Sequence, residues 1–236
     1  KKHLELCQLA YNLTSPDLHD SRHLDRKGIC LASPIIYVHE WALRLGTRYQ
    51  RYKIDSIHPV HQSTTSVVWF ATDVVNNAPV ALKLMKNYDE FAREILTRFG
   101  DKPVDTCVTK VVGWHLPEGA LTPLEHPKQR ETATEPEFFP EKPYVLVMER
   151  GSTSLFHELQ TQRLAGYNLK KIKIIFTDAV EKVQALHNVG LIHSDLKPRN
   201  FLRMNGALML CDMDAALEIG KERTQGIKCS TAYCPP

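Results

Sequence analysis

The stretch LIHSDLKPRNFL, residues 191–202, places an acidic, a basic and an amide side chain close together in the chain. A further acidic residue, Asp212, follows in CDMD. Phosphoryl transfer needs little covalent help from a protein; it needs a positioned hydroxyl group and neutralised phosphate charge. We therefore predict Asp195, which can accept the hydroxyl proton, and Lys197, which can screen the moving phosphate, as catalytic residues. Asn200 and Asp212 offer the hard oxygen ligands that Mg²⁺ prefers and are predicted to bind metal.

The composition is that of an ordinary globular protein, with 43% hydrophobic residues among 236, enough for one large domain or two modest lobes. The net charge of +3 is spread without single-sign blocks, so we expect neither nucleic acid nor an acidic membrane surface as a partner. No apolar run approaches the roughly 18 residues of a spanning helix, and no membrane segment is predicted. The six cysteines lack zinc-site spacing, which favours reduced thiols and a cytoplasmic or otherwise intracellular location.

The first two thirds of the chain carry mainly strand patterns. Residues 1–47 are expected to form an N-terminal extension or the end of a preceding domain. Short runs rich in β-branched and aromatic residues then predict five antiparallel strands, at 52–55, 66–72, 80–85, 109–116 and 144–150. An amphipathic helix is predicted over 88–99, and the proline-rich interval 117–143 is predicted to be a long surface loop. These elements make a small α+β lobe.

The remaining third is predicted to be mainly helical. Residues 168–190 carry a long apolar stripe that indicates a helix, with Asn168 as its N-cap and Gly190 at its C-terminal end. The residues on that stripe are Ile172, Ile175, Phe176, Ala179, Val183 and Leu186. Two short apolar pieces, GLIH and ALMLCD, are predicted to pair as a small hairpin. His193 is expected to be a core histidine bonded to backbone rather than a proton carrier.

HSDLKPRNFL together with CDMD resembles the catalytic and metal-binding loops of eukaryotic-type protein kinases, whose pattern is His-Arg-Asp-Leu-Lys-Pro-x-Asn followed by Asp-Phe-Gly. The resemblance implies a two-lobed α+β fold, with residues 48–151 as N-lobe and hinge and residues 152–236 as a partial, mainly helical C-lobe that stops in the activation segment. The Lys-Pro pair resembles the serine/threonine and tyrosine-kinase-like branches. The implied activity is transfer of the γ-phosphate of ATP, with Mg²⁺, to Ser or Thr hydroxyls of a protein substrate.

The resemblance also implies a nucleotide site. VALK places Lys83 on a strand and FAREI places Glu94 on the next helix, where the pair would hold the ammonium against the α- and β-phosphates. Glu90, one turn earlier, is the competing partner. KCSTAYCPP places Ser230 at the position of a Thr in the activation segment. The remaining matches to ATP-binding positions are Met148 as gatekeeper, the hinge backbone of Glu149 and Gly151, the ring-packing Val68, Ala81 and Leu202, and the phosphate-loop Ser63 and Ser66.

The phosphate loop and the residue before the catalytic Asp depart from the kinase pattern. His61, Ser63 and Ser66 stand where the glycines of the phosphate loop belong, and no glycine occurs between Gly46 and Gly100. Because glycine lets backbone amides approach phosphate closely, this departure predicts weakened nucleotide binding. Ser194 replaces the Arg that pairs with a phosphorylated activation segment in the family, so regulation by that pairing is not expected.

Two further departures concern the metal-binding turn and the preceding helix. In Asp-Met-Asp, Met213 is expected to fill the apolar slot of the Phe. Asp214 loses the easy left-handed backbone conformation of the glycine. It also adds a negative charge beside the metal, either as a third ligand or as a charge that interferes with the site. Arg98 falls one turn after Glu94, where the family has an apolar residue. Either the helix register differs there or the apolar spine is rebuilt.

Three functions are compatible with these residues. The complete ionic set favours an ATP- and Mg²⁺-dependent protein kinase acting on Ser or Thr. The missing glycines and Asp214 favour a pseudokinase that serves as a binding or scaffold module, with weak or no catalysis. A small-molecule phosphotransferase is disfavoured by VALK and by the Lys197-Pro198 pair. The sequence names no regulatory partner.

Overall fold

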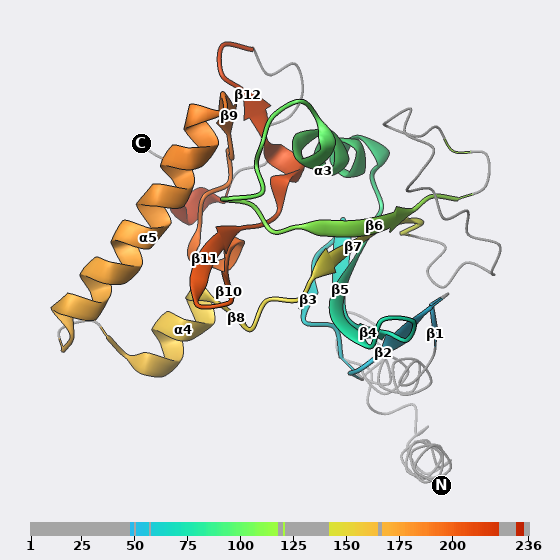
Figure 1. Ribbon diagram of the computed structural model, residues 1–236, viewed down its shortest axis with the longest axis horizontal. Coiled ribbons are helices and arrows are strands. Elements are labelled where there is room, and N and C mark those ends of the chain that lie inside the picture. The colour runs from blue at the N-terminus through green and yellow to red at the C-terminus, as the bar shows by residue number, and fades with distance from the viewer. Residues whose placement is uncertain are drawn as a thin grey trace, which may run out of the picture. The chain divides into compact units, whose positions relative to one another are not determined.

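The computed structural model describes residues 48–49, 51–56, 58–117, 120, 142–164, 167–221 and 230–233 (Figure 1). The predicted extension at 1–47 and most of the predicted loop at 117–143 lie outside the described residues. The chain divides into two compact units, Lys1–His61 with Trp69–Pro79 and Gln62–Val68 with Val80–Pro236. Every residue predicted for the site belongs to the second unit, so its geometry can be described within that unit.

The first unit contains antiparallel strands. Strand β1, Arg48–Tyr49, pairs with β2, Tyr52–Ile54, and β2 pairs in turn with the second half of β4, Ser66–Asp73. Tyr52 and Ile54 are buried while Lys53 between them is exposed, which is the period-two alternation expected of a half-buried strand. A two-residue strand β3, His61–Gln62, lies between β2 and β4 in the sequence.

The second unit contains a further antiparallel group of strands in the order β5-β7-β6. Strand β5 runs over Ala78–Met85, β7 over Tyr144–Glu149 and β6 over Val111–His115. The β5–β7 pairing runs from Val80 opposite Glu149 to Met85 opposite Tyr144. All five predicted strands are therefore present as β2, β4, β5, β6 and β7, and the short strands β1 and β3 are additions to the prediction.

Helix α3, Tyr88–Phe99, occupies the predicted helical interval. The side chain of Asn87 caps its N-terminus by accepting from the backbone amide of Asp89 at 2.8 Å. Phe91 and Ile95 are fully buried, which is the apolar face that the sequence spacing predicts. The helix ends at Gly100, where a Cβ would lie 2.6 Å from the carbonyl oxygen of Leu96, so only glycine allows this close approach.

Two helices follow. Helix α4, Leu155–Gln162, begins after the short strand β8, Thr153–Ser154, and was not predicted. Helix α5, Leu169–Asn188, confirms the predicted helix, and Asn168 caps it as expected by accepting from the Lys171 amide at 2.9 Å. Among the described residues, no helix is both long and apolar enough to cross a lipid bilayer.

One residue of the predicted apolar stripe on α5 is placed wrongly. Ile175 and Leu186 belong to the buried core, and Ile172, Ala179 and Val183 pack partly buried against it. Phe176 is 69% exposed. Adjacent helix positions lie about 100° apart around the axis, so Ile175 and Phe176 cannot both face the centre of a narrow contact. The structure places Ile175 there.

The predicted pairing of GLIH with ALMLCD is also wrong. Strand β11, Ala207–Leu210, pairs with β10, Phe201–Met204, and β9, Leu191–Ile192, pairs with β12, Leu217–Glu218. The reason is the turn Asn205-Gly206, whose two residues both have positive φ. An Asn-Gly turn closes a two-residue hairpin between the segments that flank it directly, so β10 is the partner of β11.

Arg203 ties this hairpin to the two neighbouring helices. Its guanidinium pairs with Glu158 of α4 at 2.9 Å and with Asp178 of α5 at 3.2 Å. Asp178 also accepts a hydrogen bond from the Leu208 amide on β11 at 2.9 Å. Helix α5 and strand β11, which lie side by side (Figure 1), are therefore joined by polar bonds as well as by the apolar core.

We expect the core beneath α5 to carry much of the stability of this unit. Leu186→Ala should lower the free energy of unfolding by about 2–5 kcal/mol, because Leu186 is fully buried and its truncation leaves a cavity. Chemical denaturation measures this change. The matched control is Leu169→Ala on the same helix, which removes the same atoms from a residue that is 75% exposed and should change stability by less than about 0.5 kcal/mol. Equal losses in the two variants would contradict this packing.

Candidate active site

The predicted pair of Lys83 and Glu94 is formed. Lys83 lies on β5 and Glu94 on α3, both are buried, and the lysine Nζ lies 2.5 Å from Glu94 Oε1. The lysine thus pairs with Glu94 rather than with the alternative, Glu90. Burial alone raises the pKa of Glu94, but Arg98 and Lys83 outweigh that effect and hold the pKa below its usual value. Glu94 is therefore a carboxylate at neutral pH and can hold the ammonium in place.

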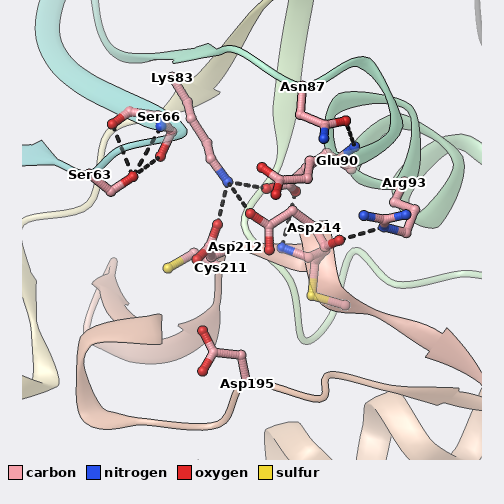
Figure 2. A network of polar contacts seen from close by, with 12 residues as sticks. Ser63, Ser66, Lys83, Asn87, Glu90, Arg93, Asp195, Cys211, Asp212 and Asp214 are labelled. Carbon is pink, nitrogen blue, oxygen red and sulfur yellow. Dashed lines mark hydrogen bonds and ion pairs between the residues drawn. The ribbon is translucent and has the colours of Figure 1, made fainter. Parts of the chain in front are cut away.

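Lys83 also meets both carboxylates of the Asp-Met-Asp turn. It forms an ion pair with Asp212, and its Nζ lies 3.7 Å from Asp214 Oδ2 (Figure 2). Burial lowers the pKa of Lys83, but Asp212, Glu94 and Asp214 together outweigh burial and hold that pKa well above its usual value. The ammonium therefore stays charged, surrounded by three acids.

The left-handed backbone of this turn falls at Asp212, with φ of 65° and ψ of 62°. Asp214 lies in the 3₁₀ helix η5, Met213–Ala215, and does not adopt positive φ. The expected loss of glycine's left-handed freedom at Asp214 is therefore wrong, because the conformation is needed two residues earlier, where Asp tolerates it. Met213 is fully buried in the apolar core, as expected for a replacement of Phe.

The predicted catalytic loop draws Asp195, Lys197 and Asn200 together. Lys197 Nζ lies 2.6 Å from Asp195 Oδ2. Asn200 donates through its amide nitrogen to the Asp195 carbonyl oxygen at 2.9 Å, so its amide oxygen is the atom available to a cation. His193 confirms its predicted structural role, since its Nε2 lies 2.8 Å from the Cys211 carbonyl oxygen. Burial holds the pKa of His193 below its usual value.

A serine hydroxyl already lies against the predicted catalytic carboxylate. Ser230 donates through Oγ to Asp195 Oδ1 at 2.7 Å, and Lys197 donates to the same Oγ at 3.0 Å. Burial raises the pKa of Asp195, but the hydrogen bonds from Lys197 and Ser230 outweigh burial and lower it. Asp195 is therefore ionised at neutral pH and is able to accept a hydroxyl proton.

The residues matched to the adenine pocket come together in two pairs. Ala81 on β5 is the cross-strand partner of Met148 on β7. A Cβ on Gly151 would lie 3.2 Å from the Leu202 Cβ, so these two residues are in close approach. The Glu149 amide donates to the Lys110 carbonyl oxygen at 3.0 Å.

The remaining matched residues lie on or near the expected phosphate loop, and this loop is closed by its own hydrogen bonds. The Ser63 amide donates to the Ser66 carbonyl oxygen at 2.8 Å, and the Ser66 amide donates to Ser63 Oγ at 3.0 Å (Figure 2). Both amides are therefore used within the loop, whereas a phosphate-binding loop directs such amides at its ligand. Val68 lies partly buried on β4, immediately after this loop.

Two contacts of the site were missed by the sequence analysis. Arg93 donates through Nε to the Asp214 carbonyl oxygen at 2.6 Å, which ties α3 to η5 (Figure 2). Arg98, expected only as an anomaly in an apolar position, is buried and pairs with Glu94 Oε2. Its sequence signal was the basic residue four positions after a conspicuous Glu, a spacing that brings side chains together on a helix.

The donor set fits Mg²⁺ and a nucleotide in part. Asp212, whose side chain is 24% exposed, and the Asn200 amide oxygen are oxygen donors of the kind Mg²⁺ prefers. Lys83 supplies a fixed cation for phosphate oxygens. The Ser63–Ser66 loop does not fit equally well, since the amides of Ser63 and Ser66 are already bonded.

Comparison with known proteins agrees with the fold. Residues 131–236 match the protein kinase domain family. The chain is 39% identical over 79 residues to the serine/threonine-protein kinase mph1 of Schizosaccharomyces pombe, covering 34% of this chain and 12% of that protein. It is 36% identical over 84 residues to the probable serine/threonine-protein kinase mps1 of Dictyostelium discoideum, covering 35% of this chain and 8% of that protein.

A mammalian relative extends the comparison. Over 83 residues the chain is 32% identical to the dual specificity protein kinase TTK of Mus musculus, covering 35% of this chain and 10% of that protein. The chain thus spans only a small part of the length of each curated relative. The matched residues 131–236 include the loop that carries Asp195, Lys197 and Asn200. The match to the protein kinase domain family, together with the antiparallel sheet and the helices, shows the α+β architecture of a partial two-lobed kinase fold.

Proposed function

We propose that this chain is part of a protein serine/threonine kinase that transfers the γ-phosphate of ATP with Mg²⁺. The observation that carries the proposal is the placement of the Ser230 hydroxyl, which donates to Asp195 Oδ1 at 2.7 Å and accepts from Lys197 at 3.0 Å. A substrate hydroxyl in the same place would have its proton directed at an ionised carboxylate. The cation beside it would meet the negative charge of an incoming phosphate.

The other site residues have positioning roles in this proposal. Glu94 holds Lys83 so that its ammonium can bind α- and β-phosphate oxygens. The Asn200 amide oxygen and the Asp212 carboxylate would hold Mg²⁺, which neutralises phosphate charge when bound. The adenine ring would pack against Val68, Ala81, Met148 and Leu202, with hinge contacts from the backbone of Glu149 and Gly151.

The substrate class is proposed as Ser or Thr hydroxyls of a protein. Support comes from two relatives, the serine/threonine-protein kinase mph1 of Schizosaccharomyces pombe and the probable serine/threonine-protein kinase mps1 of Dictyostelium discoideum, and from the Lys197-Pro198 pair. The dual-specificity relative in Mus musculus makes a Tyr hydroxyl the alternative acceptor.

A second candidate function is a pseudokinase that acts as a binding or scaffold module. Two observations favour it. The amides of Ser63 and Ser66 are bonded within the loop rather than left for phosphate, and Lys83 is engaged by Asp214 in addition to Glu94 and Asp212. Both features give groups that would otherwise bind nucleotide a partner within the chain, so a fold of this kind could persist without nucleotide.

Removal of the Asp195 carboxylate tests the transfer step. Asp195→Asn should lower Mg²⁺-dependent transfer of labelled phosphate from ATP to a Ser/Thr peptide mixture by about 10²–10⁴-fold, since the amide cannot accept the hydroxyl proton. The control is Asp105→Asn, the same change at an exposed position, which should transfer at the unaltered rate. Equal transfer by Asp195→Asn and the unaltered protein would remove the kinase proposal and leave the scaffold function.

Nucleotide binding is tested through thermal stability. Millimolar ATP with Mg²⁺ should raise the melting temperature of the unaltered protein, by an amount equivalent to about 2.7 kcal/mol if the ligand is at 100 times its Kd. Part of this rise in melting temperature should depend on Mg²⁺ and disappear when a chelator is added. Asp212→Asn should lack that Mg²⁺-dependent part. Each variant is compared with its own nucleotide-free state. An unchanged melting temperature of the unaltered protein in millimolar ATP would favour the scaffold function.

The closed loop predicts an unusual gain on mutation. Ser63→Gly should tighten ATP binding by up to about tenfold, because it removes the hydroxyl that occupies the Ser66 amide and frees that amide for a charge-assisted bond to phosphate. Calorimetry with ATP and Mg²⁺ measures the affinity. Thr64→Gly adds the same backbone freedom but keeps the Ser63 hydroxyl, so it should bind as the unaltered protein does. Equal affinities of the two glycine variants would contradict the role of Ser63.

A further inference from the structure

The two positions at which the metal-binding turn and the helix depart from the kinase pattern, Asp214 and Arg98, lie in one buried network. Arg98 stands in the last turn of α3 and Asp214 in η5, where it is 1% exposed. Glu94 and Lys83 connect them. Arg98 Nη1 pairs with Glu94 Oε2, Lys83 pairs with Glu94 Oε1, and Lys83 Nζ lies 3.7 Å from Asp214 Oδ2.

The network contains an excess of negative charge. One oxygen each of Glu94, Asp212 and Asp214 lies within 4.8 Å of the others. Carboxylates this close repel one another strongly where water is excluded. Within the part of the chain that the structure describes, Lys83 contacts all three, so its ammonium is shared among them. With an uncharged residue at position 214, the Lys83 ammonium would interact with only two carboxylates, those of Glu94 and Asp212. Asp214 adds a third.

The guanidinium of Arg98 is held by backbone as well as by Glu94. Its Nε donates to the Thr109 carbonyl oxygen at 3.0 Å, and its Nη1 donates to the Glu94 carbonyl oxygen at 3.2 Å. These acceptors fix a buried cation in one orientation and satisfy its donors, which a buried charge requires. The position is thus built for a guanidinium and not for the apolar side chain that the kinase pattern has there.

We propose that Arg98 is a positioning residue whose cation offsets the carboxylate of Asp214. With Arg98 in place, Glu94 can bind Lys83 through Oε1 and still accept from Arg98 and from the Met213 amide, at 3.1 Å, through Oε2. Helix α3 and η5 are then held together with Lys83 in position. Asp214 and Arg98 therefore compensate each other, and both act on the ionic centre of the site rather than on phosphate transfer.

A double-mutant cycle tests this coupling in the full chain. Arg98→Met keeps the length of the side chain and removes the charge, and should lower the melting temperature by about 10 °C. Asp214→Asn keeps the shape of the side chain and removes its charge. In the Asp214→Asn background, Arg98→Met should lower the melting temperature by less than half as much as it does when Asp214 is present. The reason is that the cation then has one carboxylate fewer to balance.

The control is Ile95→Val, which changes a fully buried, uncharged residue on the same helix. It should lower the melting temperature by the same amount in the unaltered protein and in the Asp214→Asn background. Arg98→Lys keeps the charge and should lose less than Arg98→Met. Equal losses for Arg98→Met in the two backgrounds, within about 2 °C, would overturn the proposal. If Arg98→Met is insoluble alone, soluble Arg98→Met/Asp214→Asn supports the coupling and an insoluble double variant overturns it.

These measurements use no nucleotide and no substrate. Their outcome is therefore independent of whether the chain transfers phosphate. A failed cycle would remove the role of Arg98 and leave the roles of Asp195 and Lys197 untouched, whereas a chain without transferase activity could still show the full coupling.

Discussion

The ion pair between Lys83 and Glu94 is the constraint around which the rest of the site is arranged. Both groups are buried, and a buried charge is tolerated only with an opposite charge and complete hydrogen bonding. Glu94 meets this requirement with one oxygen on Lys83 and the other on Arg98 and the Met213 amide. Helix α3 cannot move away from η5 without breaking these bonds, so the pair fixes the helix as well as the lysine.

The same pair determines how the Asp-Met-Asp turn can be built. Asp212 takes the left-handed conformation that turns its carboxylate to Lys83, and Met213 passes into the core while its amide remains with Glu94. Asp214 then follows in a 3₁₀ turn, buried near the same lysine. The backbone thus does not need glycine at this position, and the cost of Asp214 is electrostatic rather than conformational. This explains why its compensation is a cation, Arg98, and not a change of loop length.

The sequence predicted the elements whose signal is local. Strand periodicity located all five predicted strands, and Asn168 marked the start of α5 correctly. The sequence prediction failed where neighbouring segments compete for the same position. Ile175 is buried in the core and the adjacent Phe176 is exposed, and β11 pairs with β10 because the Asn205-Gly206 turn joins them directly. In the site, residue types gave the Lys83–Glu94 pair, and the four-residue spacing could have given the pair of Arg98 with Glu94. The contacts of Asp214 with Lys83 and of Arg98 with the Thr109 carbonyl oxygen join segments that no spacing connects.

The ionic centre and the phosphate loop act on different steps, which reconciles the apparent conflict between them. In the proposed kinase, Asp195 and Lys197 would act on the proton and charge that move during transfer, whereas the Ser63–Ser66 loop would act only on the binding of phosphates that precedes transfer. The internal bonds of the Ser63 and Ser66 amides must break before these two amides can bind phosphate, and that cost falls on the bound complex and the transition state alike. Loss of such uniform binding raises KM and leaves kcat unchanged. The departures in the loop are therefore compatible with a working catalytic centre that requires high nucleotide concentration, and a weak affinity for ATP would not by itself identify this chain as a scaffold.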